Sequence, residues 1–364
     1  MKFYDLGHVP WLHSQLIYHA LPRLQREALI ILAPAEPYVC IGYHQDAEQE
    51  VDLDYCRVHP VRPACQVADV GPGAIPVFRR EVGGGAVYLD GQQIFYQLVI
   101  HRDNPLVPRG KEAFYRHFLA PVVETYRQVG VEARYRPVND IVTAAGRKIT
   151  GTGAADIGDY QILVGNLILD FDYDTMVRVL RVPDEKYRDK VFTTLRENLT
   201  TLRRELGLVP PYQELVDRLA HQFAPLVGGL EPAELDQAVY DKVAELTPRF
   251  TAEEWLFKRG KRHAQRQVHI ATGVDVLRRV HKAPGGLIRG DSVLRQGRLS
   301  DVSLSGDFFF YPAEKLGALE EALEGIPPQE VEAVIARFYA AEGIESPGVT
   351  PADLAQVLQP YGAT

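Results

Sequence analysis

Short apolar runs separated by turn-forming residues dominate the first hundred positions of the chain. Residues 28–32 (ALIIL) and 38–42 (YVCIG) predict two buried strands, with prolines at positions 34 and 37 between them. A third run at 94–100 (IFYQLVI) predicts another strand. We therefore expect this part of the chain to contribute to a sheet.

The period of the apolar positions changes after residue 110. Phe114, Phe118, Val122 and Tyr126 recur at helical spacing within residues 111–128, and Gly130 follows as an end signal. The pattern then predicts strands near 132–135, 141–143 and 161–171, followed by helices at 174–183, 184–206 and 211–226. Strands and helices alternate without a strict strand–helix–strand rhythm, which favours the α+β class.

Length and charge narrow the class of protein. A chain of 364 residues is long enough for two cores, and its net charge of −8 argues against a general nucleic-acid binder. No apolar run approaches the roughly 18 residues that span a bilayer, and the first residues lack the apolar stretch of a secretory signal. We therefore expect a cytoplasmic protein without nucleic-acid or membrane partners.

The three cysteines, Cys40, Cys56 and Cys65, are odd in number and form no CxxC pair. Reduced thiols are the default for such residues in the cytoplasm.

Residues 78–96 (FRREVGGGAVYLDGQQIFY) contain the most informative pattern for function. Three consecutive glycines, 83–85, allow positive φ angles and let a ligand approach the backbone amides closely. Successive amides in such a turn form a concavity that binds anions, and Arg79 and Arg80 add cations with a fork geometry suited to carboxylate or phosphate. The alternative is a glycine-rich hairpin turn with arginines at its rim.

A second segment, 138–154 (VNDIVTAAGRKITGTGA), contains candidate polar residues beside short strands. Lys148 follows a predicted strand and could supply a cation, although on its own it is also compatible with an exposed turn lysine. Asn139 and Asp140 form either an Asx turn at a strand start or a ligand-binding pair.

Together the two segments resemble the lipoate–protein ligase family, within the lipoate/biotin ligase superfamily. The family pattern is RR-x-x-GGG-x-V-Y-x-D, followed by N-D-apolar-apolar and G-x-K-apolar-x-G. Residues 285–323 resemble the small accessory domain of that family. The resemblance implies a large mixed-sheet catalytic domain at 1–250, a basic linker at 251–271 and a small α+β accessory domain at 272–364.

The activity implied by the resemblance is ATP-dependent lipoylation. Lipoate is activated to lipoyl-AMP, and the lipoyl group is then transferred to a lysine of an acceptor protein. Lys148 matches the essential lysine, and Asp140 is the expected ligand of Mg²⁺. The other positions that match the binding site for ATP and the acyl group are Arg80, Gly83, Gly84, Gly85, Ala86, Val87, Tyr88, Asn139 and Asp140.

Lipoate or octanoate is the expected acyl substrate. The expected acceptors are lipoyl-domain proteins: 2-oxoacid dehydrogenase subunits, the glycine-cleavage H protein or a specialised lipoyl carrier. Two departures from the family pattern leave open how the outer part of the nucleotide or the acceptor lysine is held. Leu89 stands where the family often has histidine, and Val164-Gly165-Asn166 stands where it often has His-Gly-Thr.

Three other functions are weighed against the ligase. An octanoyl or lipoyl transferase of this family forms a thioester on a cysteine downstream of the lysine motif, but here no cysteine follows Cys65. A biotin ligase would have a glycine- and arginine-rich loop ending in tryptophan, and the tryptophans here lie elsewhere, at positions 11 and 255. A non-catalytic lipoyl-binding module would be expected to lose Lys148 or Arg80.

Two further stretches have no assigned role. Residues 58–75, rich in proline and glycine, form either a tolerated surface loop or a lid beside the site. Residues 258–266 (KRGKRHAQR) are locally basic in an acidic protein and form either an exposed linker face or a docking patch for an acidic protein substrate.

Overall fold

A six-stranded mixed sheet lies at the centre of the larger part of the protein, in a computed structural model that describes residues 1–58, 74–259 and 274–360. Strand β1 pairs in parallel with β2 and β12, whereas β2–β6, β6–β11 and β11–β10 are antiparallel. In spatial order the strands are β10 (Thr152–Ile157), β11 (Tyr160–Ile168), β6 (Gln93–His101), β2 (Ala28–Pro34), β1 (Lys2–Val9) and β12 (Glu231–Pro232). The predicted α+β class with a large mixed sheet is confirmed.

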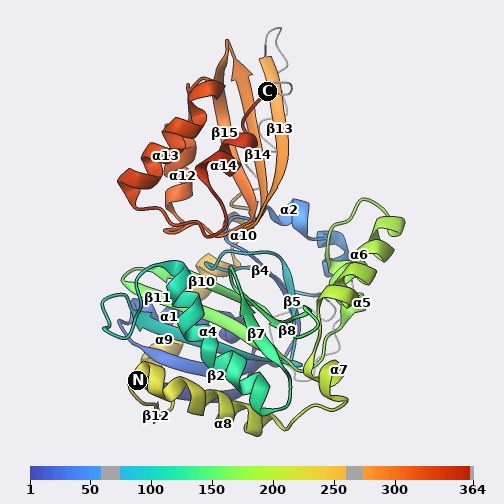
Figure 1. Cartoon of the computed structure of the whole chain (residues 1–364), viewed down its shortest axis with the longest axis vertical. Coiled ribbons are helices and arrows are strands. Elements are labelled where there is room, and N and C mark those ends of the chain that lie inside the picture. The colour runs from blue at the N-terminus through green and yellow to red at the C-terminus, as the bar shows by residue number, and fades with distance from the viewer. Residues whose placement is uncertain (59–73, 260–273, 361–364) are drawn as a thin grey trace. The chain divides into compact units, whose positions relative to one another are not determined.

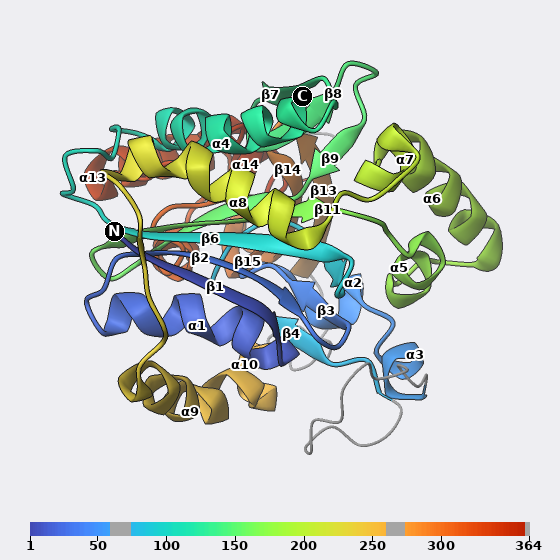
Figure 2. The ribbon, with the colours of Figure 1, turned by 90° about the horizontal axis from the view of Figure 1, so that it is seen from below.

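Helices cover both faces of this sheet, as Figure 2 shows with α4 and α8 on one side and α1 and α9 on the other. Helix α4 spans Lys111–Gln128, the predicted range, and Phe114, Phe118 and Val122 are fully buried. The other three are α1 (Trp11–Arg23), α8 (Tyr212–Phe223) and α9 (Gln237–Thr251). Burial on both faces explains why β2 is apolar along its whole length.

Two smaller sheets contain the sequence motifs. One has the order β4–β3–β5, with β3 at Tyr38–Ile41, β4 at Val77–Arg79 and β5 at Val87–Leu89. The other has the order β7–β8–β9, with β7 at Ala133–Arg136, β8 at Asp140–Thr143 and β9 at Lys148–Thr150. The strands expected near 38–42, 132–135 and 141–143 are therefore confirmed.

The single helix expected at 184–206 is wrong, because two helices occupy that range. Helix α6 ends at Asn198, and Leu199 and Thr200 then adopt an extended path beside Lys148, whose carbonyl accepts a hydrogen bond from the Thr200 amide at 2.8 Å. The Thr201 side chain caps the next helix. The remaining elements here are α3 (Leu53–Val58), α5 (Tyr173–Val179), α6 (Glu185–Asn198), α7 (Leu202–Leu206), a 3₁₀ helix η1 (Ala224–Val227) and α10 (Glu253–Leu256).

The chain divides into two compact units that are not continuous in sequence. The first comprises Met1–Cys40, Val51–Phe78 and Val87–Leu256, and the second comprises Ile41–Glu50, Arg79–Ala86 and Phe257–Thr364. Figure 1 shows the three-stranded antiparallel sheet of the second unit with its helices. Its elements are α2 (Ala47–Glu50), β13 (Val274–Ala283), β14 (Gly286–Arg295), β15 (Arg298–Asp307), α12 (Lys315–Ala322), η2 (Pro328–Glu330), α13 (Val331–Glu342) and α14 (Pro351–Gln356).

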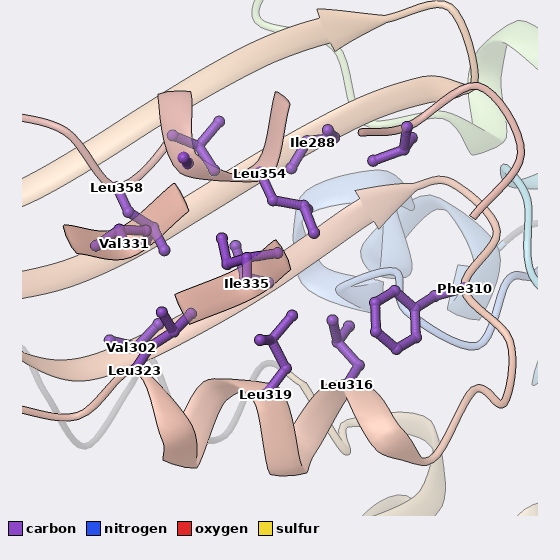
Figure 3. Packing of buried hydrophobic residues seen from close by; sticks show 14 of the residues in the cluster. Ile288, Val302, Phe310, Leu316, Leu319, Leu323, Val331, Ile335, Leu354 and Leu358 are labelled. Carbon is purple, nitrogen blue, oxygen red and sulfur yellow. The ribbon is translucent and has the colours of Figure 1, made fainter. Parts of the chain in front are cut away.

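One apolar core holds the second unit together (Figure 3). Leu316 and Leu319 of α12 and Ile335 of α13 pack against residues of the sheet such as Ile288 and Val302. Strand β15 stops at Asp307. Beyond it, Phe308 and Phe310 belong to the core whereas Phe309 does not.

Arg259, within the locally basic stretch, is not part of an exposed face. Its guanidinium pairs with Glu320 at 2.6 Å, and the two side chains are 6% and 2% exposed. The same carboxylate oxygen accepts the amide of Leu304 at 2.8 Å, on the outer edge of β15. Loss of either partner would leave a buried charge unpaired, which destabilises a protein by several kcal/mol. The ion pair therefore fixes the start of segment 257–364 to α12. Residues 260–266 lie outside the described residues, as do residues 59–73 of the proline-rich stretch.

None of the helices in the described ranges has the length and apolar character needed to cross a membrane.

The turn between β5 and β6 contains a carboxylate with an unusual environment, and this gives a prediction about stability. Burial above all, together with the charges of Asp172 and Asp170, raises the pKa of Asp90 from 3.8 to about 6, against hydrogen bonds from Gln92 and Gln93. Because the folded pKa exceeds the unfolded one, the native state binds more protons between these values. Asp90 therefore makes the protein less stable as the pH rises from about 4 to 6.

We expect Asp90→Asn to raise the free energy of unfolding at pH 7.5 by about 1–3 kcal/mol, since the amide cannot ionise. Thermal unfolding followed by circular dichroism at pH 4.5 and 7.5 checks this, with a larger gain at the higher pH. Asp54→Asn is the control, because that side chain is 95% exposed. A loss of stability at pH 7.5 would contradict the expectation.

Candidate active site

Lys148 lies at the start of strand β9 and not in a turn. Its backbone is fixed on two sides, by pairing with Val142 of β8 and by the hydrogen bond from Thr200 to its carbonyl. The side chain is 35% exposed, and its ammonium nitrogen lies 2.7 Å from Oδ1 of Asp140. A rigid backbone thus presents a cation that solvent and ligands can reach.

Asp140 lies between two cations. Its Oδ2 accepts a hydrogen bond from Nη2 of Arg136 at 2.7 Å, while Oδ1 contacts Lys148. Burial raises the pKa of Asp140, but Lys148 and Arg136 outweigh burial and leave the pKa below its usual value. The carboxylate is therefore ionised at neutral pH, and the three groups together have one net positive charge.

The pairing of Asp140 bears on the predicted magnesium site. Both carboxylate oxygens already contact a cation, so a divalent ion on Asp140 would lie next to Lys148 and Arg136. No cluster of three or more His, Cys, Asp or Glu side chains suited to a metal occurs in the described ranges. The assignment of a magnesium ion to Asp140 stays a prediction.

Asn139 holds the backbone beside Asp140. Its Nδ2 donates to the carbonyl of Thr152 at 2.6 Å, and the Thr152 hydroxyl donates to the carbonyl of Asn139. This reciprocal pair joins the start of β8 to the start of β10. Asn139 is therefore positioned to fix the neighbouring carboxylate through the backbone.

Asn166 and Leu89, two residues that depart from the family pattern, both have defined neighbours in the structure. The Asn166 side chain accepts the amide of Gly151 at 2.8 Å and donates to Oε1 of Gln93 at 2.6 Å, so it ties β11 to the segment after Lys148. Leu89 is buried in β5, opposite Tyr38.

Strand β5 also contains two of the predicted binding residues. Val87 is half-buried opposite Cys40, and Tyr88 is buried opposite Val39. Burial, followed by the charge of Asp90, raises the pKa of the Tyr88 phenol, which is therefore neutral.

The glycine loop, residues 83–85, lies in the second unit and is held by Arg80. Nη2 of Arg80 donates to the carbonyls of Gly83 at 2.7 Å and Gly85 at 2.9 Å. Because the carbonyl and the amide of a trans peptide point in opposite directions, the amides of Gly84 and Ala86 point away from this guanidinium. Gly84 has φ of +90°, a conformation that side chains rarely adopt.

A turn that sequence reasoning missed supports the loop. A Cβ on Gly42 would lie 1.8 Å from the carbonyl oxygen of Gly84, so the two backbones touch directly. Nη1 of Arg79 donates to the carbonyls of Gly42 (3.1 Å), Tyr43 (2.9 Å) and Gln45 (2.5 Å). Gly42 follows a buried strand, but no local signal relates it to a loop some forty residues away.

Arg79 is therefore not the exposed cation that the sequence suggested. The side chain is fully buried, and burial lowers its pKa to about 10, with the charge of Arg259 acting in the same direction. It remains protonated at neutral pH and donates hydrogen bonds to the backbone carbonyls of the supporting turn. Of the arginine pair, Arg80 is the one that contacts the glycine loop.

The candidate residues thus form two groups. Val87, Tyr88, Asn139, Asp140 and Lys148 belong to the first unit, and Arg80, Gly83, Gly84, Gly85 and Ala86 to the second. Each group combines a fixed cation with backbone that its neighbours hold in place. Such groups suit the binding of anions, carboxylates and phosphates in particular.

The described cysteines are poor nucleophiles. Cys40 and Cys56 are both buried, and burial raises the pKa of Cys56 to about 12, so its thiol stays protonated. Cys65 lies outside the described residues.

Comparison with known proteins agrees with these features. The family model for the lipoyl protein ligase A/B catalytic domain matches residues 8–224. The octanoyltransferase LipM of Kyrpidia tusciae is 26% identical over 245 residues, 61% of this chain and 84% of that protein. Subunit 1 of the lipoate–protein ligase A of Thermoplasma acidophilum is 31% identical over 173 residues, which span 45% of this chain and 59% of that subunit.

A solved structure extends the likeness to the fold. It is the bipartite lipoate protein ligase from Thermoplasma acidophilum, studied with its E2 lipoyl domain, and it superimposes with a TM-score of 0.59 at 26% identity, over 70% of this chain and 95% of that chain. Since the family model covers more than half of the chain, the protein belongs to the lipoyl protein ligase A/B catalytic-domain family, whose members include lipoate–protein ligases and octanoyltransferases.

Proposed function

We propose that the protein is an ATP-dependent lipoate–protein ligase. In the first step a carboxylate oxygen of lipoate attacks the α-phosphorus of ATP, which forms lipoyl-AMP and releases pyrophosphate. In the second step the neutral amine of an acceptor lysine attacks the acyl carbonyl, and AMP leaves as the amide forms. The acceptor is a lipoyl-domain protein, and octanoate is the alternative acyl substrate.

Lys148 is the proposed catalytic residue for the first step. The carboxylate of lipoate and the triphosphate of ATP, both anions, must approach each other. An ammonium about 4 Å from an anion stabilises it by on the order of 4 kcal/mol at an effective dielectric near 20. Its present partner, Asp140, keeps a second cation in Arg136, so Lys148 can turn toward a ligand without leaving that carboxylate unpaired. The Ala86 amide, next to the Gly85 carbonyl that Arg80 holds, supplies a further donor for a phosphate or carbonyl oxygen.

The observation that favours the ligase over a transferase is the position of the cysteines. All three lie at or before residue 65, so no thiol follows the lysine motif, where this family's transferases form their thioester. The two described cysteines are buried, and the thiol of Cys56 is protonated. An octanoyltransferase remains the second candidate, because this chain matches an octanoyltransferase over 84% of that protein's length.

The reaction itself gives the first test. Incubation with lipoate, Mg-ATP and an apo H protein should add one lipoyl group to the acceptor, measured by intact mass. Omission of ATP is the control and should abolish the added mass. Absence of product, together with efficient transfer from an octanoyl-carrier protein, would replace the ligase by a transferase.

Replacement of all three cysteines, Cys40, Cys56 and Cys65, by serine or alanine should leave the rate of lipoylation within a few-fold, because no thioester is proposed. Steady-state lipoylation and a thermal melt of the same preparation check this. A folded variant without activity would restore the transferase mechanism.

Lys148→Met should reduce the rate of pyrophosphate release by about 10²–10³, since it removes a cation aimed at developing charge. The fold should persist, because Asp140 keeps its pairing with Arg136. The control is Lys2→Met, which breaks another lysine–carboxylate pair, with Glu231 at 2.6 Å. A near-normal rate in the Lys148 variant would remove this residue from the mechanism.

A further inference from the structure

The glycine loop has a second neighbour that the proposed chemistry does not use, the segment Asp307–Phe309 at the end of β15. A Cβ on Gly83 would lie 2.9 Å from Cδ1 of Phe309, and one on Gly84 would lie 3.3 Å from Cζ of the same ring. A Cβ on Gly85 would lie 3.0 Å from Oδ2 of Asp307. The three glycines are therefore packed against this segment, and a side chain at any of them would push against it.

Phe309 is itself held rigidly. Its neighbours Phe308 and Phe310 are buried in the apolar core of the second unit, whereas Phe309 is not part of that core. The ring of Phe309 is 5% exposed and stacks on Tyr311, with ring centroids 6.1 Å apart. Figure 3 shows Phe310 at the edge of that core, beyond the end of β15.

The loop is thus enclosed by three groups, two of which come from distant parts of the sequence. Arg80 holds two of its carbonyls, Gly42 touches the carbonyl of Gly84, and Phe309 packs on Gly83 and Gly84. The amide of Gly84 also donates a hydrogen bond to the carbonyl of Phe308, at 3.5 Å, so the segment that carries Phe309 fixes this amide directly. Three consecutive glycines have high backbone entropy, so a single defined shape depends on such contacts.

We propose that Phe309 is a positioning residue for substrate activation: it packs on the glycine loop and holds the loop backbone in the shape that presents its remaining amides to the anionic ligands. This inference rests on the proposed function, because it assigns the loop to lipoate and ATP. Phe309 acts through the loop and not on the reacting atoms.

The two chemical steps should depend on Phe309 to different extents. Activation brings two separate anions, the acyl carboxylate and the triphosphate, to one set of donors, so it needs those donors preorganised. Transfer starts from lipoyl-AMP, in which the acyl group and one phosphate are already joined. A loosened loop should therefore slow activation more than transfer.

Phe309→Ala tests this with two rate measurements on the full chain. Pyrophosphate release with lipoate and Mg-ATP should fall by about tenfold or more, while transfer from pre-made lipoyl-AMP to apo H protein should stay within about threefold. Phe309→Leu, which restores an apolar contact, should recover most of the activation rate. Phe309→Val provides a milder truncation, with an intermediate loss expected, if the alanine variant does not fold.

Hydrogen–deuterium exchange of the peptide covering residues 80–88 gives a readout that does not depend on activity. Exchange of this peptide should be faster in the Phe309 truncations than in the wild type. The matched control is Phe338→Ala, a half-buried aromatic that packs on the core of the same unit through α13. It should alter neither the exchange of this peptide nor the activation rate.

The outcomes separate the two proposals. Three results for Phe309→Ala would overturn the role of Phe309 and leave the ligase function standing. They are unchanged activation and exchange, a faster activation rate, and an equal loss of rate in both steps. If the wild type releases no pyrophosphate, the proposed function fails. The exchange measurement then still decides whether Phe309 holds the loop.

Discussion

Direct backbone contact around Gly83–Gly85 is the constraint on which the assembly of the second unit depends. Gly42 and Phe309 leave no space for a Cβ at the contact points, and Arg80 draws two loop carbonyls toward one guanidinium. Segments 41–50, 79–86 and 307–309 are far apart in the sequence, and they meet closely because the glycines have no side chains at the points of contact. The glycines thus serve packing as well as ligand approach.

Three cationic side chains, Arg79, Arg259 and Lys148, have different kinds of partners and different exposure, and this difference bears on which of them can bind a ligand. Arg79 binds three backbone carbonyls and Arg259 binds Glu320, both with almost no exposure. The Lys148–Asp140 pair is 35% and 21% exposed, so solvent weakens it and its partners can exchange. Among these three cations, Lys148 is the one suited to change partner when a ligand arrives.

The chain passes between the two units several times, unlike a simple tandem arrangement. Strand β3 continues into segment 41–50, and the chain passes from β4 through segment 79–86 into β5. The stretch that matches the catalytic-domain family, 8–224, therefore includes two segments that pack with residues 257–364. A structural change in residues 257–364 can therefore alter the glycine loop by direct packing, because both belong to the second unit.

The sequence by itself determined the local elements and the motifs. Helical spacing defined Lys111–Gln128, apolar runs defined β2, β3 and β6, and the two motifs identified the family, because all of these depend on neighbouring residues. Only the tertiary structure decided that Arg79 is buried, that 184–206 is broken at Leu199, and that Gly42 and Phe309 enclose the glycine loop. These features arise from contacts between residues from about forty to more than two hundred positions apart, and no local periodicity records such contacts.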